Sequence, residues 1–100
     1  MNKKDRYIYP AVFEYADDGI SISFPDLPGC LSCAADDEDA LHMAKDALSG
    51  HLMTLKGAGE VVPEPTALVN LKTESNQRTV LVEVSMSSVR ERERTGLHQK

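Results

Sequence analysis

The sequence predicts a small α+β protein of two layers, with the element order β-β-β-α-β and one helix covering one face of the sheet. Three observations predict this class. Apolar and polar side chains alternate on both sides of an Asp18-Gly19 turn signal. An apolar stripe with helical spacing follows over residues 41–55. Alternation then returns over residues 80–86, which indicates a last strand.

The first two strands are predicted as a hairpin over about residues 6–15 and 19–24. Gly19 can take the positive φ that a tight hairpin turn requires. Pro10 lacks the N–H group that a central strand donates, so it predicts an edge strand or a bulge. One face of the first strand carries Tyr7, Tyr9, Ala11, Phe13 and Tyr15, and the other carries Ile8, Val12 and Glu14.

A Pro25-Asp26-Leu27-Pro28-Gly29 corner precedes a short third strand, which is predicted over about residues 29–34. Two prolines and a glycine fix a turn, and this structural interpretation accounts for the motif by itself. An apolar Leu27 at the apex of a rigid, acidic loop would also make a good anchor for a partner, because little entropy is lost on docking. The residues leave both interpretations open.

The helix is predicted to begin after Asp36 and to end near Lys56. Asp36 is a suitable N-cap, and Asp39 fits an acidic variant of the capping box. Gly57, Gly59 and the prolines beyond them end the helix. The apolar stripe consists of Leu41, Ala44, Leu48, Leu52 and Leu55.

An extended linker is predicted over residues 60–78, with one short helical turn at about 67–71. The last strand follows over about residues 79–86. Residues 1–86 therefore form one domain, and residues 87–100 form a short charged tail. If the tail is helical, Arg90 and Arg94 share one face and could contact phosphate. A solvated tail is the simpler interpretation.

The composition indicates an acidic, cytoplasmic protein. The chain has 100 residues and a formal net charge of −5. Between residues 7 and 55 the only lysine or arginine is Lys45, against nine aspartates and glutamates. Such a surface repels nucleic acid and attracts cationic partners. The sequence has neither a signal peptide nor an apolar run of membrane-spanning length.

The Cys30-Leu31-Ser32-Cys33 motif has the spacing of redox and zinc sites. In an extended strand, however, residues three apart point to opposite faces, so the two sulfur atoms do not converge. His42 and His51 are the nearest further zinc ligands, but they fall on opposite faces of the helix. We therefore predict two reduced thiols, no metal and no cofactor.

A catalytic role would need clustered carboxylates or a nucleophile with a base. Glu14 and Glu83 are the strand carboxylates, and they belong to different strands. Ala11 and Val12 stand at the centre of the first strand. The histidines have no acid at a spacing that indicates pairing. The sequence therefore predicts a non-enzyme.

Taken together, the hairpin, the Gly19-Ile20-Ser21-Ile22-Ser23-Phe24 strand, the Pro-Asp-Leu-Pro-Gly-Cys corner and the acidic start of the helix resemble the HicB family of bacterial antitoxins. The resemblance covers roughly residues 7–86. It implies a reduced ribonuclease H-like fold. It also implies a HicA-like toxin as the partner: a small, basic ribonuclease that cleaves mRNA.

The resemblance implies an antitoxin that neutralises this toxin by covering its active and RNA-binding surface. The predicted toxin-binding residues are Asp17, Asp18, Asp26, Leu27, Asp36 and Asp37. Many relatives carry a DNA-binding segment after this domain, whereas the present tail has no periodic apolar pattern. We therefore expect no sequence-specific DNA binding by this chain. A homo-oligomer, either a dimer or a tetramer, is expected because one helix cannot cover both faces of a sheet.

Two other functions remain open at this point. One is a residual metal-dependent nuclease of the ribonuclease H type, and the other is a ligand-binding domain without a toxin partner.

Overall fold

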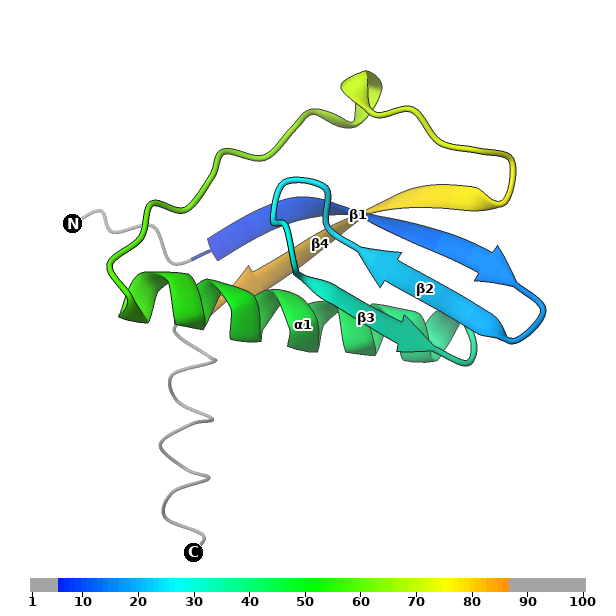
Figure 1. Cartoon of the computed structure of the whole chain (residues 1–100), viewed down its shortest axis with the longest axis horizontal. Helices are drawn as coiled ribbons and strands as arrows, with labels where there is room; N and C mark the ends of the chain where they lie inside the picture. Colours follow the sequence, from blue (N-terminus) through cyan, green and yellow to red (C-terminus); the bar gives the residue numbers. More distant parts are fainter. Residues whose placement is uncertain (1–5, 87–100) are drawn as a thin grey trace, which may run out of the picture.

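The computed structural model describes residues 6–86. They form a four-stranded antiparallel sheet, in the order β3-β2-β1-β4, with one long helix packed against it (Figure 1). The predicted α+β class and element order are confirmed. The elements are β1 (Arg6–Ala16), β2 (Gly19–Ser23), β3 (Leu31–Ala34), α1 (Asp37–Gly57), the 3-10 turn η1 (Leu68–Asn70) and β4 (Gln77–Ser85).

The hydrophobic core lies between the sheet and α1. The odd-numbered side chains of β1 from Tyr7 to Phe13 are buried, whereas Ile8 and Glu14 are exposed on the other face. The predicted division of β1 into an inner and an outer face is therefore confirmed. The other strands add Ile20, Ile22, Val82 and Val84 to the inner face.

The buried side of α1 shares Ala44, Leu48 and Leu52 with the predicted stripe, but it includes Ala40 and Ser49, and Leu55 is only half-buried. Ala40, Ala44, Leu48 and Leu52 are fully buried, whereas Leu41 is 47% exposed. The prediction placed Leu41 in the stripe because of its spacing from Ala44 and Leu48, and this was wrong. Ala40 and Ala44 have small side chains, which let the first half of the helix approach the sheet closely.

Both ends of α1 are capped. The Asp36 carboxylate accepts a hydrogen bond from the Asp39 N–H at 2.9 Å, so the predicted N-cap is confirmed. At the other end, Gly59 has a φ of +73°, its N–H bonds the Lys56 carbonyl, and the next N–H, of Glu60, bonds the Leu55 carbonyl. This pair of bonds is a Schellman motif, which favours glycine at the left-handed position.

β1 is a central strand of the sheet, but Pro10 lies beyond the end of its ladder with β2, so β1 has a free edge at this residue, as the proline predicts. The Tyr15 N–H bonds the Asn76 carbonyl on the β4 side, so the even-numbered N–H positions of β1 face β2. The β1–β2 ladder ends at the pair Val12–Ser23. Continued by two residues, the same register would place Pro25 opposite Pro10. Neither proline has an N–H group to donate, which explains why the ladder ends there.

The linker between α1 and β4 runs along the side of the sheet away from α1 in the view of Figure 1. It contains the predicted short turn as η1. The Tyr9 hydroxyl donates to the Pro63 carbonyl and ties the linker to the sheet. Burial, followed by the negative charge of Glu64, raises the pKa of this phenol.

Candidate functional site

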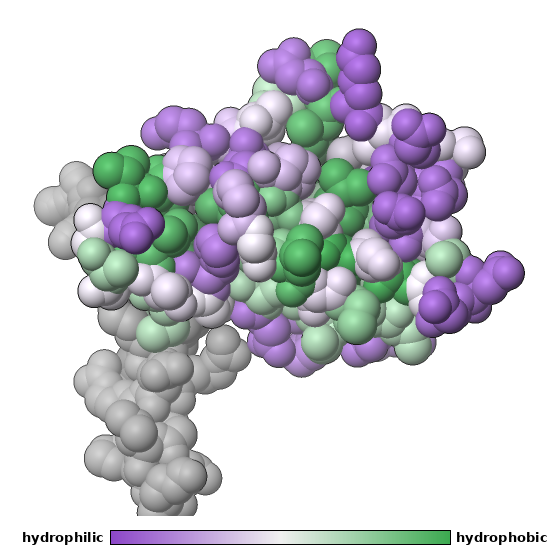
Figure 2. Space-filling view, viewed as in Figure 1, coloured by the Kyte–Doolittle hydropathy of each residue, from purple (hydrophilic) through white to green (hydrophobic). Residues whose placement is uncertain are grey.

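Four of the six predicted toxin-binding residues come together at one end of the molecule. Asp17 and Asp18 form the turn between β1 and β2, and Asp36 and Asp37 form the start of α1. Both segments lie at the right-hand end of Figure 1. The turn is hydrophilic there in the space-filling view (Figure 2). We call these four residues, together with Glu38 and Asp39, the acidic end.

Gly19 brings the two segments together. It follows Asp18 with a φ of +138°, and a Cβ at this position would lie 2.8 Å from the Ala34 carbonyl oxygen. Ala34 ends β3, two residues before the N-cap of α1. Only glycine therefore allows the turn to pack this closely against the chain that enters the helix.

Asp37 is held in place by the sheet. The Tyr15 hydroxyl at the end of β1 donates to the Asp37 carboxylate at 2.6 Å. This bond raises the pKa of the Tyr15 phenol, because ionising it would set a phenolate against a carboxylate. The side chains of Asp17 and Asp18 are exposed. The acidic end thus combines one carboxylate of fixed orientation with others that reach into solvent.

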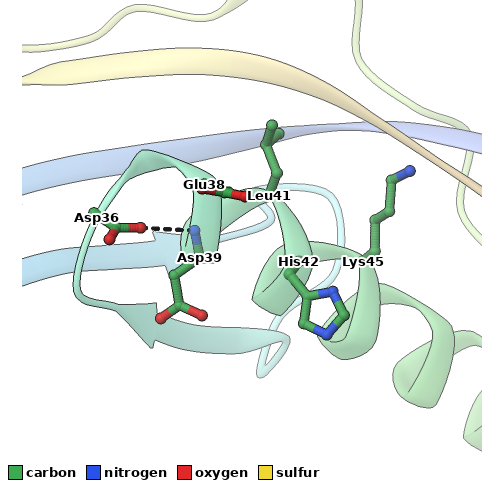
Figure 3. Close-up of a pocket in the computed structure, with 6 residues that line it drawn as sticks. All are labelled: Asp36, Glu38, Asp39, Leu41, His42 and Lys45. Atoms are coloured by element: carbon green, nitrogen blue, oxygen red, sulfur yellow. Dashed lines mark hydrogen bonds between the residues drawn. The ribbon is translucent and has the colours of Figure 1, made fainter.

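Two shallow hollows adjoin the acidic end. The first follows the opening turns of α1 and is lined by Asp36, Glu38, Asp39, Leu41, His42 and Lys45 (Figure 3). The second is lined by Tyr15, Asp37, Ser75, Asn76 and Arg78. Tyr15, Asn76 and Arg78 line this hollow but were not predicted as site residues. No local signal could have found them, because they join residues about 60 positions apart in the chain.

The other two predicted site residues, Asp26 and Leu27, lie in the corner at residues 25–29, away from the acidic end. Asp26 lies at the other end of β2, where both carboxylate oxygens accept hydrogen bonds from Thr66: its N–H at 2.9 Å and its hydroxyl at 2.5 Å. Leu27 is 1% exposed and belongs to the protein's own core. The prediction of Leu27 as an exposed anchor was wrong, because the corner folds inward and closes with bonds from Leu27 N–H to Phe24 and from Cys30 N–H to Leu27.

A comparison with family models decides the identity of the fold. Residues 9–95 match the model of the HicB_like antitoxin of bacterial toxin-antitoxin systems. The chain belongs to this family.

Solved antitoxin and toxin-antitoxin structures share the fold. The N-terminal domain of the Burkholderia pseudomallei antitoxin HicB is 25% identical, with a TM-score of 0.64 over 79% of this chain and 99% of that one. A toxin-antitoxin complex from Streptococcus pneumoniae gives a TM-score of 0.76 at 20% identity, over 84% of this chain and 72% of that chain. A HicA3 and HicB3 toxin-antitoxin complex gives 0.65 at 22% identity, over 76% of this chain and 95% of that chain.

A phage protein is also similar to this HicB-like antitoxin. An uncharacterized 14.9 kDa protein from the rep-hol intergenic region of Haemophilus phage HP1 is 29% identical over 77 residues. The match covers 77% of the present chain and 58% of the phage protein. The chain therefore spans less than two thirds of the length of this relative. Within residues 6–86, no helix is long and apolar enough to cross a membrane.

The two cysteines of the antitoxin lie in opposite environments, as the strand geometry predicts. Cys30 is buried, and its thiol donates to the Ala47 carbonyl, whereas Cys33 is exposed. Burial raises the pKa of the Cys30 thiol to about 11. A pair divided in this way does not suit a shared metal or a redox couple. The absence of metal and of a disulfide remains a prediction.

The strand carboxylates are also far apart. Glu83 lies opposite Ile8, and Glu14 is six residues further along β1, so the two are separated by about 20 Å at 3.3 Å per residue. Glu83 pairs with Arg6 at 2.5 Å, and Glu14 accepts from Gln77. Two carboxylates at this separation cannot share one metal ion. The predicted phosphate contacts Arg90 and Arg94 lie outside the described residues.

Proposed function

We propose that this antitoxin binds a HicA-like toxin, a small basic ribonuclease that cleaves mRNA, and neutralises it by covering its active and RNA-binding surface. The observation that carries the proposal is the acidic end on a HicB-like fold. Six carboxylates from two segments are gathered there, and the relatives in the solved toxin-antitoxin complexes share this fold.

Charge supports both the choice of partner and the mode of inhibition. A surface that binds RNA is basic, because it must neutralise phosphates. An acidic surface of complementary shape can cover this basic surface and exclude RNA. Complementary charge also speeds encounter, so the antitoxin can capture the toxin before an mRNA does. Asp17, Asp18, Asp36 and Asp37 are the residues proposed to face the toxin, and Asp26, at the other end of β2, is proposed to meet the same partner.

A non-catalytic role is part of the proposal. The separation of Glu14 from Glu83 and the capping role of Asp36 argue against a two-metal nuclease centre in residues 6–86. We further propose a cytoplasmic homo-oligomer whose domain of residues 1–86 binds the toxin. Sequence-specific DNA binding is not expected from residues 87–100.

Co-expression tests the proposal. A cognate HicA-like toxin should arrest growth when expressed alone, and the wild-type antitoxin should relieve the arrest. Purified antitoxin should form a stable complex with the toxin and block RNA cleavage. Leu27→Asp, which introduces a charge into the core, is the matched control and should not rescue growth. Persistent arrest together with the absence of a complex would contradict the proposal.

A further inference from the structure

The strand β3 has one edge that pairs with nothing in the described part of the chain. It is the outermost strand of the sheet, beyond β2. The Phe24 N–H bonds the Cys30 carbonyl, so Phe24–Cys30 is a hydrogen-bonded pair of this antiparallel ladder. Such pairs alternate along the strands, which makes Leu31–Ser23 and Cys33–Ser21 the pairs without hydrogen bonds. The peptide groups of Leu31 and Cys33 therefore point away from β2, toward the open edge.

This edge lacks two of the features that usually protect edge strands, charge and proline, and is protected only by its short length of four residues. The four residues Leu31–Ala34 include no charge and no proline. Leu31 is 67% exposed and Cys33 is exposed beside it. In the view of Figure 1, β3 crosses in front of α1, and no other element is drawn over it. The opposite edge strand, β4, carries Arg78 and also Glu83, which is paired with Arg6. Charges of this kind discourage strand addition, so β3 is the edge that remains open to it.

The charges around β3 select the kind of strand that can pair there. Asp26 lies in the corner before β3, and Asp36 begins the acidic run after it. An antiparallel β3 from a second copy would set the acids of each corner against the acidic end of the other copy. Like charges in that position oppose pairing. A strand from a basic protein would instead find attraction at both ends.

We infer that the open edge of β3 receives an extended segment of a basic protein partner as a fifth strand of the sheet. The Leu31 and Cys33 peptide groups supply the hydrogen bonds of this added strand. An apolar side chain of the segment covers Leu31, and basic residues at its ends meet Asp26 and the acidic end. The inference rests on the proposed function, because the partner it describes is the toxin.

A proline in β3 tests the inference with the folded, full-length chain. Cys33→Pro removes an N–H that the β2 ladder does not use, so the fold should be retained. Cys33→Ala is the matched control, because it alters the same side chain and keeps the N–H. Affinity for the purified toxin should fall at least tenfold in the proline variant and stay within twofold in the alanine variant. Thermal unfolding of both variants verifies that the fold is intact.

Hydrogen exchange provides a second readout, independent of any variant. The amides of Leu31 and Cys33 should exchange rapidly in the free antitoxin and become protected in the complex. The Ser32 amide faces β2 and should be protected in both states. Unchanged affinity of Cys33→Pro, or fast exchange at both amides in the complex, would overturn the inference while leaving the proposed function standing. If the wild-type chain forms no complex, the proposed function fails and this inference fails with it.

Discussion

The corner at residues 25–29 and the turn at residues 16–19 both join strands, and both combine aspartate with glycine. The corner faces inward: Leu27 is in the core, and Asp26 is bonded through both carboxylate oxygens to Thr66. The turn faces outward, with Asp17 and Asp18 exposed. Asp26 therefore also stabilises the fold at one end of β2, whereas Asp17 and Asp18 at the other end extend into solvent and are available to a partner. Predictions that separate stability from binding test this difference.

The largest effect is expected from shortening the corner's apolar side chain. Leu27→Ala removes a fully buried side chain and leaves a cavity, which costs about 2–5 kcal/mol. Urea unfolding of the variant measures the loss. Leu31→Ala, at an exposed leucine four residues away, is the control and should change the free energy of unfolding by less than about 0.5 kcal/mol. Equal losses in the two variants would show that the corner is not part of the core.

The buried thiol next to the corner predicts a loss of stability in alkali. The pKa of Cys30 is raised from 9.0 to about 11, so folding favours the neutral thiol. This contribution is fully present below pH 9 and is lost as the pH rises toward 11. It amounts to on the order of 2 kcal/mol.

Urea unfolding at pH 8 and pH 10.5 measures this effect. Cys30→Ala should lose less stability than wild type between the two pH values, whereas Cys33→Ala should behave as wild type does. The phenols of Tyr9 and Tyr15 also have raised pKa values and contribute in the same direction in every variant. An identical pH dependence in wild type and Cys30→Ala would contradict the prediction.

A smaller effect is expected from the bond between the corner and the linker. Asp26→Ala removes an acceptor of two hydrogen bonds and should lower the free energy of unfolding by about 1–2 kcal/mol. Thr66→Ala is the partner variant, and it keeps the backbone N–H bond to Asp26. Because the two residues act together, the double variant should lose less than the sum of the single variants. Strict additivity would show that the bond contributes nothing to stability.

The outward turn should show the opposite behaviour, with the smallest effect on stability. Asp17→Asn with Asp18→Asn should change the free energy of unfolding by less than about 0.5 kcal/mol. The rate of association with the toxin should fall by roughly threefold to tenfold, and the difference should shrink at high salt. Stopped-flow mixing at two ionic strengths measures it.

Asp46→Asn with Glu60→Gln gives the same change of net charge at exposed sites away from the acidic end. If this control pair slows association equally, then net charge, and not the acidic end, accounts for the rate.

Much of the fold could be predicted because its causes are local. The alternation in β1, the Asp36 cap and the short η1 turn depend on neighbouring residues, and each agrees with the sequence pattern. The predictions failed where contacts between distant parts of the chain determine which side chains are buried. Ala40 is buried and Leu41 is exposed because the distance between α1 and the sheet depends on the side chains of both elements.

The candidate site shows the same division. The acidic run at the start of α1 could be predicted. That it lies close to Asp17, however, depends on the close packing of Gly19 against Ala34. The two interpretations of the corner could not be separated by sequence, because Asp26 finds its partner 40 residues away at Thr66. Arg78 and Asn76 join the site only because β4 pairs with β1.

The prolines at positions 10 and 25, which a longer β1–β2 ladder would place opposite each other, limit how this hairpin can lengthen. A longer β1–β2 ladder needs donors at both positions, since the next hydrogen-bonded pair would join them. A single substitution restores one N–H donor and leaves the other proline in place, so it adds at most one hydrogen bond to the ladder. Both hydrogen bonds of that pair therefore require two substitutions. The two prolines therefore both fix the length of the hairpin, and with it the position of the corner.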